Sequence, residues 1–439
     1  MLEPALLIII FILFVLIILS YTKSSLDFVA ISLLCCFIAA TITGLVKGIG
    51  IESFIGYIEW EAIIIILSMS IITKIAQDSN ILEFVAVKLF KFSRGEQRIF
   101  FWLLCIITTL LAAIISDVVV VLILAPIVIR LCHFLKIRAG TYLLGMTICI
   151  NIGSIITPFS SGENIIISTA FTRAGIAQMD TLYFIQYYWI FSFFLLFTTI
   201  FLLDRYILRK EPKIEALQKK FVIDLIDTDI MVKNKKMFYF NAIAIMITII
   251  LFAALPLLYL TAASSALVLV LVNRGYTKKP MSALLKDIEW EIIFFFISLY
   301  VVIGCLLEAG FQDLFTAIPF QTFNPFLMSI LILIIISFVS GVVANTPTAL
   351  IFIPIVSTLI DNFNFSSVPL LFAFIIGINL GGNFIPQGAA CDMMTLKIAR
   401  DSGVENMSYK RLLKMGGTFA LIHLAISIIF LLLVVLFFG

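Results

Sequence analysis

The chain has 439 residues, of which 62% are apolar and 13% charged, and its mean hydropathy is +1.20. No soluble domain carries such an apolar surplus, and many runs reach the 18 or more apolar residues that cross about 30 Å of hydrocarbon. The formal net charge of +3 indicates no particular partner. Two histidines and seven cysteines without a CxxC exclude metal catalysis by a histidine cluster and indicate cysteines that pack.

The apolar runs predict ten membrane crossings and two helical hairpins. Short amphipathic stretches at 81–93 and 311–323 are expected to lie at the interface as arms before the hairpins. The first run has no basic leader and no small-residue cleavage site, so we expect a retained span. The crossings are expected at 4–21, 27–46, 60–77, 139–175 (broken), 181–204, 237–254, 257–272, 289–308, 367–400 (broken) and 415–438, and the hairpins at 98–136 and 325–362.

The two halves of the chain read as copies of each other. Each half has five crossings and one hairpin, and because five is odd the second copy must be inverted. We expect a first repeat at 1–208, with scaffold spans in 1–77, and a second at 237–439, joined by a charged cytoplasmic linker at 209–236. The matching segments are 58–61 with 288–291, 117–128 with 345–356, and 151–158 with 379–386.

Lysine and arginine predict the orientation. With both termini outside, 27 of the 29 basic residues fall on inner segments, and Lys47 and Arg173 are the two outer ones. We therefore expect an integral protein of the plasma (inner) membrane, with both termini outside. Trp60 and Trp290 are expected to mark the interface.

Polar residues interrupt the apolar chain at four places: the two hairpin turns and the two broken helices. Such matching interruptions in two apolar halves are typical of a transporter's binding site. The candidate substrate- and ion-binding residues are Ser116, Asp117, Asn151, Thr157, Pro158, Ser160, Ser161, Gly162, Glu163, Asn164, Asn345, Thr346, Pro347, Asn379, Asn383, Pro386, Gln387, Gly388, Cys391 and Asp392.

The broken helices suggest how an ion is held. Pro158 and Pro386 interrupt the helical ladder, which predicts free carbonyls for a cation and free N–H groups at half-helix N-termini for an anion. Unpaired acids in lipid each cost at least ~2.5–3.5 kcal/mol, so these acids must bind cations, bind protons or face water. The candidate Na⁺ ligands are Asp117, Glu163, Asn345 and Asp392.

Structural alternatives remain open. Asp117 and Asn345 are residue types that cap helices, and Glu163 and Asp392 would suit the first turn of their half-helices. Cys391 could serve as a soft ligand. Each hairpin arm has about 17–19 residues, enough to cross fully at 1.5 Å per residue, although two matching polar turns favour re-entrant hairpins that meet inside the membrane.

From residue 57 to residue 400 the chain resembles the ion transporter superfamily of arsenite permeases, sodium/proton antiporters and divalent anion/sodium symporters. The resemblance rests on four motifs: 116–126, 151–164, 344–348 and 381–392. It implies two hairpin tips and two unwound loops that form paired ion sites, with substrate between them. It also implies elevator-type movement of hairpins and broken helices against a scaffold of the other spans, and a homodimer.

The chain departs from the symporters at two sites. They resemble Ser-Asn-Thr at both tips, whereas this chain has Ser116-Asp117-Val118 at the first, and it has Asp392 where many members have Asn. Both changes add negative charge, which would repel a dicarboxylate unless cations accompany it. We therefore expect proton- or sodium-coupled arsenite-type efflux or cation/proton antiport, with sodium-coupled di- or tricarboxylate symport as the alternative.

Two other classes fit less well. Ser160-Ser161-Gly162 resembles the GxSG of intramembrane serine proteases, but Phe159 stands where that motif needs Gly, so we expect no enzyme. A channel could use the same parts, but inverted repeats with broken helices favour alternating access. The expected partners are the lipid bilayer, a small ion and a second copy of the chain, with no nucleic acid, and the expected cofactors are none beyond a coupling Na⁺ or H⁺.

Overall fold

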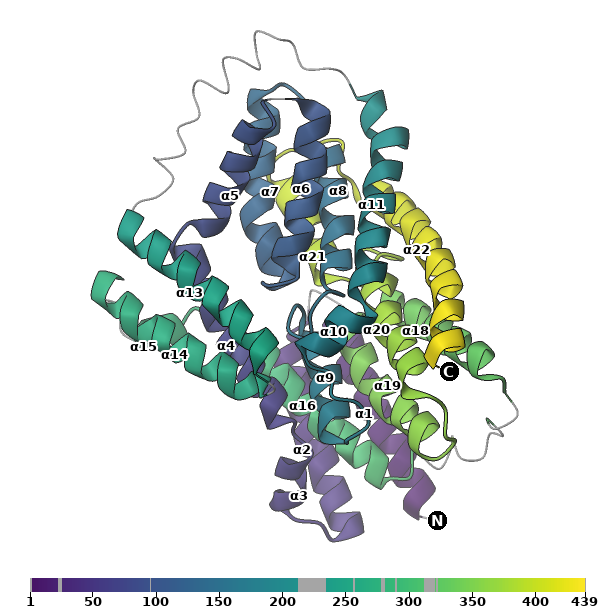
Figure 1. Ribbon diagram of the computed structural model, residues 1–439. Helices are drawn as coiled ribbons and strands as arrows, with labels where there is room; N and C mark the ends of the chain where they lie inside the picture. The colour runs from purple at the N-terminus through teal and green to yellow at the C-terminus, as the bar shows by residue number, and fades with distance from the viewer. Residues whose placement is uncertain are drawn as a thin grey trace.

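The computed structural model is helical throughout the residues that it describes (Figure 1). Those residues are 2–22, 26–94, 96–211, 234–255, 257–277, 281–288, 290–311, 320 and 323–438. The expected all-α architecture with two inverted repeats is confirmed. Most of the linker at 209–236 and most of the second arm at 311–323 lie outside the described residues.

The helices of the first repeat follow the predicted order. They are α1 (Leu2–Thr22), α2 (Phe28–Lys47), α3 (Ile51–Gly56), α4 (Trp60–Asp78), α5 (Ile81–Phe92), α6 (Gln97–Ala112), α7 (Asp117–Phe134), α8 (Ala139–Gly153), α9 (Gly162–Arg173), α10 (Thr181–Tyr187) and α11 (Trp189–Tyr206). The 3-10 turn η1 (Leu208–Lys210) follows.

The second repeat mirrors this order. Its helices are α13 (Lys235–Ala254), α14 (Leu258–Thr277), α15 (Met281–Leu285), α16 (Trp290–Glu308), α18 (Pro325–Val343), α19 (Asn345–Asp361), α20 (Ser367–Gly381), α21 (Ala390–Asp401) and α22 (Tyr409–Phe438). One side-chain hydrogen bond recurs at corresponding residues of the two repeats. The Trp60 indole donates to the Ile55 carbonyl, and the Trp290 indole donates to the Leu285 carbonyl.

Both hairpins and both broken helices form where the sequence predicts them. The arms α6 and α7 meet at a turn over 113–116, and α18 and α19 meet at Ala344, which has a φ of +83°. The backbone leaves the helix between α8 and α9 and again between α20 and α21. Proline and glycine at these places remove or weaken helical hydrogen bonds, so the local sequence accounts for the interruptions.

The helices differ from the prediction in several places. The span expected at 181–204 is divided at Tyr188 into α10 and α11, and the last span begins at Tyr409, six residues early. The short helices α3 and α15 were not predicted. They occupy matching positions before α4 and α16, and each has six or fewer residues, too few to show a period.

Ten helices in the described residues are long and apolar enough to cross a membrane. They are not the predicted ten. The set includes the hairpin arms α7 and α18, whereas the halves of the broken helices, such as α8 and α20, fall short because each half has only 12 to 15 residues. Length alone therefore does not separate a hairpin arm from a crossing.

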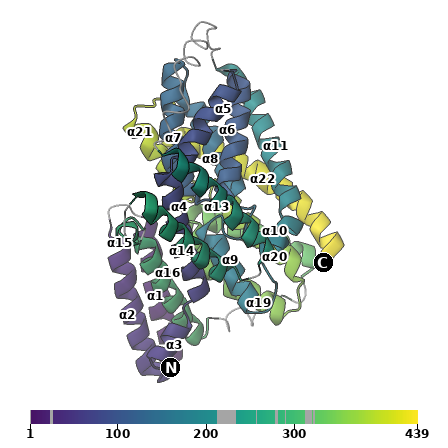
Figure 2. The ribbon, with the colours of Figure 1, turned by 60° about the vertical axis from the view of Figure 1, so that its left-hand side comes forward.

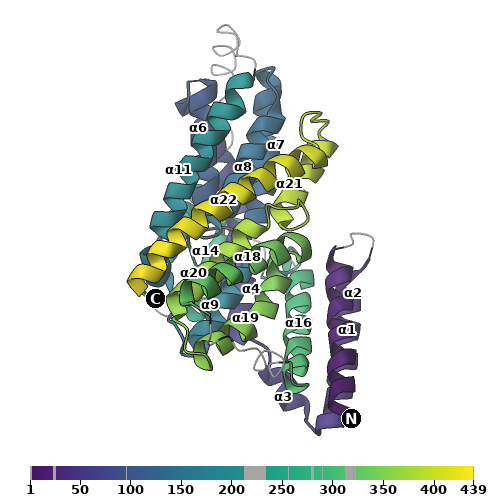
Figure 3. The same cartoon turned by 90° about the vertical axis from the view of Figure 1, so that its right-hand side faces the viewer.

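Two hydrophobic cores divide the molecule. The scaffold core joins α1, α2, α4, α13, α14 and α16. The hairpin core joins α5 to α8, α10, α11 and α18 to α22. The division places α11 and α22 with the hairpins, not with the scaffold as the resemblance had implied, and Figure 3 shows α22 as a long diagonal helix that crosses α11.

The repeats exchange partners across the molecule. Helix α2 packs on α16, and its counterpart α14 packs on α4 (Figure 2). Hairpin arm α7 packs on α21, and its counterpart α19 packs on α9. Neither repeat therefore forms a self-contained unit, and these helix contacts come in pairs related by the internal duplication.

Candidate functional site

A cavity of about 570 Å³ lies where the scaffold core meets the hairpin tips. The scaffold wall comes from α1, α4 and α16 and includes Tyr21, Lys74 and Phe295. The opposite wall comes from the hairpins and the breaks. Of the predicted site residues, the cavity is lined by Ser116, Asp117, Ser160, Ser161, Gly162, Glu163, Asn345, Thr346, Gln387 and Gly388.

The other predicted residues lie behind this wall. They do not border the cavity but hold its lining in place, and they are Asn151, Thr157, Pro158, Asn164, Pro347, Asn379, Asn383, Pro386, Cys391 and Asp392. All of them are buried. The predicted constellation thus divides into an accessible layer and a sealed layer.

Each hairpin tip faces the half-helix of the other repeat. The Asn345 amide of α19 donates to Glu163 Oε1 on α9 at 3.0 Å. At the corresponding positions of the other two elements, Asp117 of α7 lies opposite Cys391 on α21. Asp117 and Asn345 are 228 positions apart, as are Glu163 and Cys391. The two half-sites therefore use corresponding positions, with the acid on opposite partners.

Four amide and carboxyl side chains cross at the centre. Asn379 donates to Asn164 Oδ1 at 2.8 Å, and Asn151, the mate of Asn379, donates to Asp392 Oδ1 at a longer 3.5 Å. Asn151 also donates to Asn383 Oδ1 at 2.8 Å. The acid at position 392, where the first repeat has Asn164, is what makes the centre asymmetric.

In the described residues, only one of the two carboxylate oxygens of Asp392 has hydrogen-bond partners. Its Oδ1 accepts from Thr147 at 2.7 Å as well as from Asn151, whereas its Oδ2 is buried without a partner in the described part of the chain. The same is true of Asn379 Oδ1 and Asn383 Nδ2. Buried polar atoms are normally paired, so these three are poised for a ligand such as an ion or water.

The prediction of free carbonyls in the first break is wrong for two of them. The Ser160 hydroxyl donates to the carbonyls of Ser154 and Thr157, and the Asn164 amide donates to the same two oxygens. Thr157 in turn donates to the Ala113 carbonyl of the first hairpin turn at 2.6 Å. Side chains thus satisfy the interrupted backbone and anchor the hairpin.

The capping alternatives have mixed outcomes. Asp117 and Asn345 are the first residues of their helices, not the N-caps, and the caps Ser116 and Ala344 make no side-chain cap hydrogen bond. Glu163 lies in the first turn of α9, as predicted, and Asp392 does so in α21. Asp117 nevertheless accepts a hydrogen bond from the Val118 N–H at 2.8 Å, whereas Asn345 directs its amide to Glu163.

Sequence reasoning missed several residues of the site. Ser340 donates to Asn345 Oδ1 and to the Ile378 carbonyl, which fixes the second tip on α20. Thr147 supports Asp392 from α8. Ser340 lies within two turns of a tip on an otherwise apolar helix, a signal that could have been used, whereas the scaffold wall carries no motif of its own.

The two ends of the cavity differ. Toward the start of α4, the Tyr57 ring lies 2.2 Å from where a side chain on Gly304 would begin, and Arg173 of α9 pairs with Glu59 at 2.9 Å. Toward the end of α4, Lys74 and Asp287 border the cavity and are partly exposed.

In the described residues, no three His, Cys, Asp or Glu side chains converge as ligands for a metal ion. Asp117, Cys391 and Asp392 are neighbours without meeting that arrangement. Cys391 donates to Asn151 Oδ1 at 3.1 Å, which gives its thiol a structural role in the sealed layer.

The fold and the site define a membrane transporter built from inverted repeats with broken helices. The sequence profile of the CitMHS family, described as citrate transporter, matches residues 9–377, and the chain belongs to that family. It is thereby a member of the ion transporter superfamily, as its motifs indicated. This membership implies a transporter and not an enzyme.

Curated relatives and a solved structure agree with this assignment. A 46 kDa membrane protein of Mycobacterium leprae is 25% identical over 384 residues, covering 85% of this chain and 86% of that protein. An uncharacterized transporter of Mycobacterium tuberculosis is 26% identical over 381 residues, with the same coverage. The YdaH transporter of Alcanivorax borkumensis shares the fold, with a TM-score of 0.61 over 88% of this chain and 87% of that one at 11% identity.

Proposed function

We propose that the protein is a proton- or sodium-coupled secondary transporter that performs arsenite-type efflux or cation/proton antiport. The charge of the cavity carries the proposal. Asp117 and Glu163 line it, Asp392 lies behind them, and Lys74, the one basic residue among the described lining residues, is ion-paired. A cation or a neutral hydroxide enters such a cavity without the repulsion that a free anion meets.

The coupling ion belongs at the junction of the half-sites. Carboxylate and amide oxygens of Asp117, Glu163, Asn345 and Asp392 are suitable ligands for Na⁺, and the unpaired Asp392 Oδ2 is the strongest candidate among them. A proton on one of the acids is the other means of neutralising the charge. Either ion would offset the cost of acids buried in the membrane.

Sodium-coupled transport of a di- or tricarboxylate is the second candidate, and the family description as citrate transporter favours it. The hydroxyls of Ser116 and Thr346 and the Asn345 amide offer hydrogen-bond donors at the tips. Co-bound cations would have to compensate Asp117 and Glu163. This candidate therefore predicts that carboxylate uptake depends steeply on the cation.

The mode of movement is an elevator. The two hydrophobic cores support this proposal, because each is continuous within itself and the cavity lies between them, while only a few apolar residues such as Ile165, Ile166 and Leu350 pack across the boundary. The hairpin core, including α11 and α22, would move against the scaffold core. We further propose a homodimer in the plasma membrane with both termini outside.

Purified protein in proteoliposomes tests the function. Fluxes of arsenite, citrate, succinate, sodium and protons are measured under imposed pH and sodium gradients. Arsenite or cation flux driven by one gradient supports the first proposal, and cation-dependent citrate uptake without arsenite flux supports the second. Single-channel steps in a planar bilayer would contradict both, because a carrier cannot conduct continuously.

A further inference from the structure

The scaffold helices α4 and α16 correspond residue by residue at an offset of 230. Ser68 donates to the Ile64 carbonyl at 2.7 Å, and Ser298 donates to the Phe294 carbonyl at 2.9 Å, so the same bond recurs at corresponding positions. Both serine side chains are buried. This recurrence supports the register, so each residue of α4 has a defined counterpart on α16.

The cavity borders one half of this pair of helices. Ile66 and its counterpart Phe296 both line it. From this point the lining continues toward the end of α4 and the start of α16, and its other residues on the two helices are Met69, Ser70, Thr73, Lys74, Gln77, Ile292 and Phe295. The cavity therefore extends from the middle of the scaffold wall toward one end.

The other half of the same surface, which we call the closed half, is covered by packing. The counterparts of the lining residues Ser70 and Thr73 are Tyr300 and Ile303, which are 6% and 9% exposed. The Tyr300 hydroxyl has no hydrogen-bond partner within the described part of the chain. A buried phenol without a partner is unfavourable, and it would gain one if water reached the closed half in another state.

The hairpin arms differ in the same way. On α7 the lining of the cavity extends more than one turn from the tip to Leu122, which is 39% exposed. On α19 it ends at Thr346, and Leu350, the counterpart of Leu122, is 3% exposed and packs in the scaffold core. One leucine of the pair therefore borders the cavity while the other seals the closed half.

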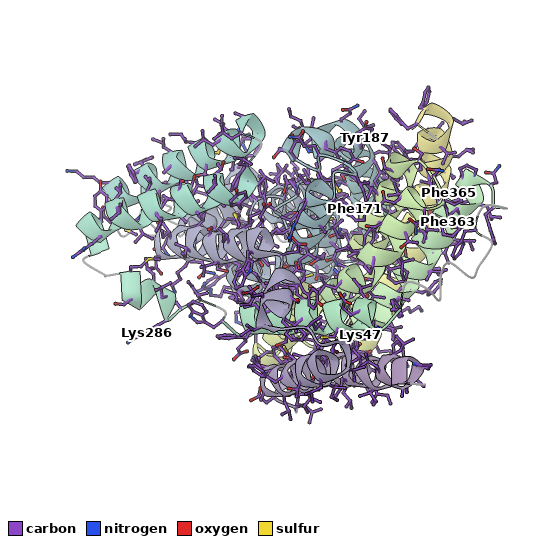
Figure 4. All side chains as sticks on the ribbon, turned by 90° about the horizontal axis from the view of Figure 1, so that it is seen from below. Lys47, Phe171, Tyr187, Lys286, Phe363 and Phe365 are labelled. Atoms are coloured by element: carbon purple, nitrogen blue, oxygen red, sulfur yellow. The ribbon has the colours of Figure 1, made fainter. Side chains whose placement is uncertain are left out.

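The helices that carry these leucines follow the same division. Helix α19 packs on α16, and α9 packs on α4, whereas their counterparts α7 and α21 border the cavity opposite the scaffold. In the view from below, Phe171, near the end of α9, lies within the packed interior (Figure 4). One pair of helices thus contacts the scaffold, and the corresponding pair stands away from it.

We propose that the closed half is a second opening of the cavity, lined by Tyr300 and Ile303 of α16 and by Leu350 of α19, through which the cargo reaches the other side of the membrane. In the state that uses it, α19 and α9 separate from the scaffold, and α7 and α21 pack on it. Leu122 then takes the place that Leu350 has here. Because one leucine leaves the scaffold as another enters, the buried apolar area changes little. This inference rests on the elevator movement of the proposed function and assigns the residues that exchange.

Cysteine labelling from each side of the membrane tests the second opening without requiring transport. Leu122→Cys and Leu350→Cys proteins are each exposed to membrane-impermeant trimethylammonium methanethiosulfonate in right-side-out and in inside-out vesicles. Ala349→Cys is the matched control, because Ala349 and its counterpart Val121 are both buried in the hairpin core. All seven native cysteines are buried, and their background reaction is measured with the parent protein and subtracted.

The second opening predicts labelling from opposite sides. Leu122→Cys should react from one side and Leu350→Cys from the other, at about 0.1–10% of the Leu122→Cys rate, which is the range expected of a minor state. Ala349→Cys should react from neither side. Glu59→Gln removes the ion pair between the scaffold and Arg173 of α9, so it should raise the Leu350→Cys rate about 1.5- to fivefold.

The scaffold wall offers a second, independent comparison. Thr73 lines the cavity, and its counterpart Ile303 lies in the closed half, so Thr73→Cys and Ile303→Cys should also react from opposite sides. Ser298→Cys is the control, because Ser298 and its counterpart Ser68 are both buried and neither borders the cavity.

Labelling of both members of either pair from the same side would overturn the second opening. A Leu350→Cys rate no higher than that of Ala349→Cys would overturn it as well, since local unfolding of α19 would expose both positions equally. Opposite-side labelling in a protein that moves none of the tested solutes would contradict the proposed function and leave the second opening standing. Gradient-driven flux without labelling of Leu350→Cys would do the reverse.

Discussion

At the scale of single residues, the site consists of side-chain pairs in which each repeat contributes one member. Asn345 reaches Glu163, and Asp117 faces Cys391, so each acid of the accessible layer lies opposite a neutral partner from the other repeat. One substitution therefore changes a contact between repeats and not only a local cap.

Neutralising the acids should impair transport more than folding. Asp117→Asn, Glu163→Gln and Asp392→Asn each keep the shape of the side chain and remove its charge. We expect at least about a tenfold loss of coupled flux in proteoliposomes for each variant, because the ion loses a charged ligand.

Glu52→Gln is the control, since Glu52 is exposed on α3 away from the cavity. Thermal melting should place all four variants within a few degrees of the parent. Full coupled flux in both Asp117→Asn and Asp392→Asn would show that these acids act only as structural groups.

Two matched glycines set the distance between hairpin and broken helix. A Cβ on Gly153 would lie 2.4 Å from the Thr109 carbonyl oxygen, and one on Gly381 would lie 2.4 Å from that of Ser337. Each alanine substitution should therefore destabilise the fold by about 1–3 kcal/mol. The expected result is a lower melting temperature in detergent for both variants.

Gly275→Ala is the comparison, because nothing lies within 4 Å of the position on α14. Alanine favours helix there, so that variant should melt at or above the temperature of the parent. Melting temperatures for Gly153→Ala and Gly381→Ala equal to that of Gly275→Ala would show that the close approach is not real.

Much of the site could be predicted at the residue scale, but not its pairing. The breaks, tips and acids follow from proline, glycine and charged residues in apolar surroundings, which are local signals. That Ser160 and Asn164 would occupy the carbonyls of Ser154 and Thr157 depends on how the loop folds back. No spacing rule in the chain encodes it.

At the scale of helices, α9 occupies the boundary between the two cores. Ile165 and Ile166 pack in the scaffold core, whereas Ile167 and Phe171 pack in the hairpin core. Its Glu163 borders the cavity at one end, and its Arg173 pairs with Glu59 at the other. This half-helix therefore contacts the cavity, the hairpin core and the scaffold.

A buried amide pair holds the scaffold helices together. Asn241 of α13 and Asn273 of α14 donate to each other at 2.7 Å, and Asn241 also donates to Ser79 after α4. Asn241→Ala leaves the Asn273 amide without that partner, so it should destabilise the protein by about 1–3 kcal/mol. Melting in detergent measures the loss.

The double variant Asn241→Leu/Asn273→Leu is the test of mechanism. Replacing both partners with apolar groups removes the buried amides of both helices, so the double variant should be more stable than Asn241→Ala. Equal or greater destabilisation in the double variant would show that the helices depend on the amide contact itself.

The helices also show where prediction from sequence ends. The apolar runs predicted the membrane spans, and the matching polar turns predicted the hairpins. The assignment of α11 and α22 to the hairpin core could not be predicted, because their lipid-facing and protein-facing residues are similarly apolar. In a membrane protein, apolar periodicity predicts where helices form but does not predict which helices pack together.

At the scale of the whole molecule, two cores meet along one cavity that is open at one end. At the start of α4, Arg173 of α9 pairs with Glu59, and the Tyr57 ring packs on Gly304 within the scaffold. The inverted repeats provide a reason for a second state, since these positions have counterparts in the other repeat. Elevator-type transport therefore requires that the hairpin core move relative to the scaffold.

Cross-linking the two cores measures this requirement directly. Glu59→Cys/Arg173→Cys protein is treated with a short bifunctional methanethiosulfonate linker, and flux of the solute identified in the panel is measured before and after reduction. A second double variant, Thr141→Cys/Asn406→Cys, links two positions within the hairpin-core side, where Arg411 contacts both residues. The account predicts that the first cross-link abolishes flux reversibly and the second leaves it intact. Undiminished flux through fully cross-linked Glu59→Cys/Arg173→Cys protein would contradict it.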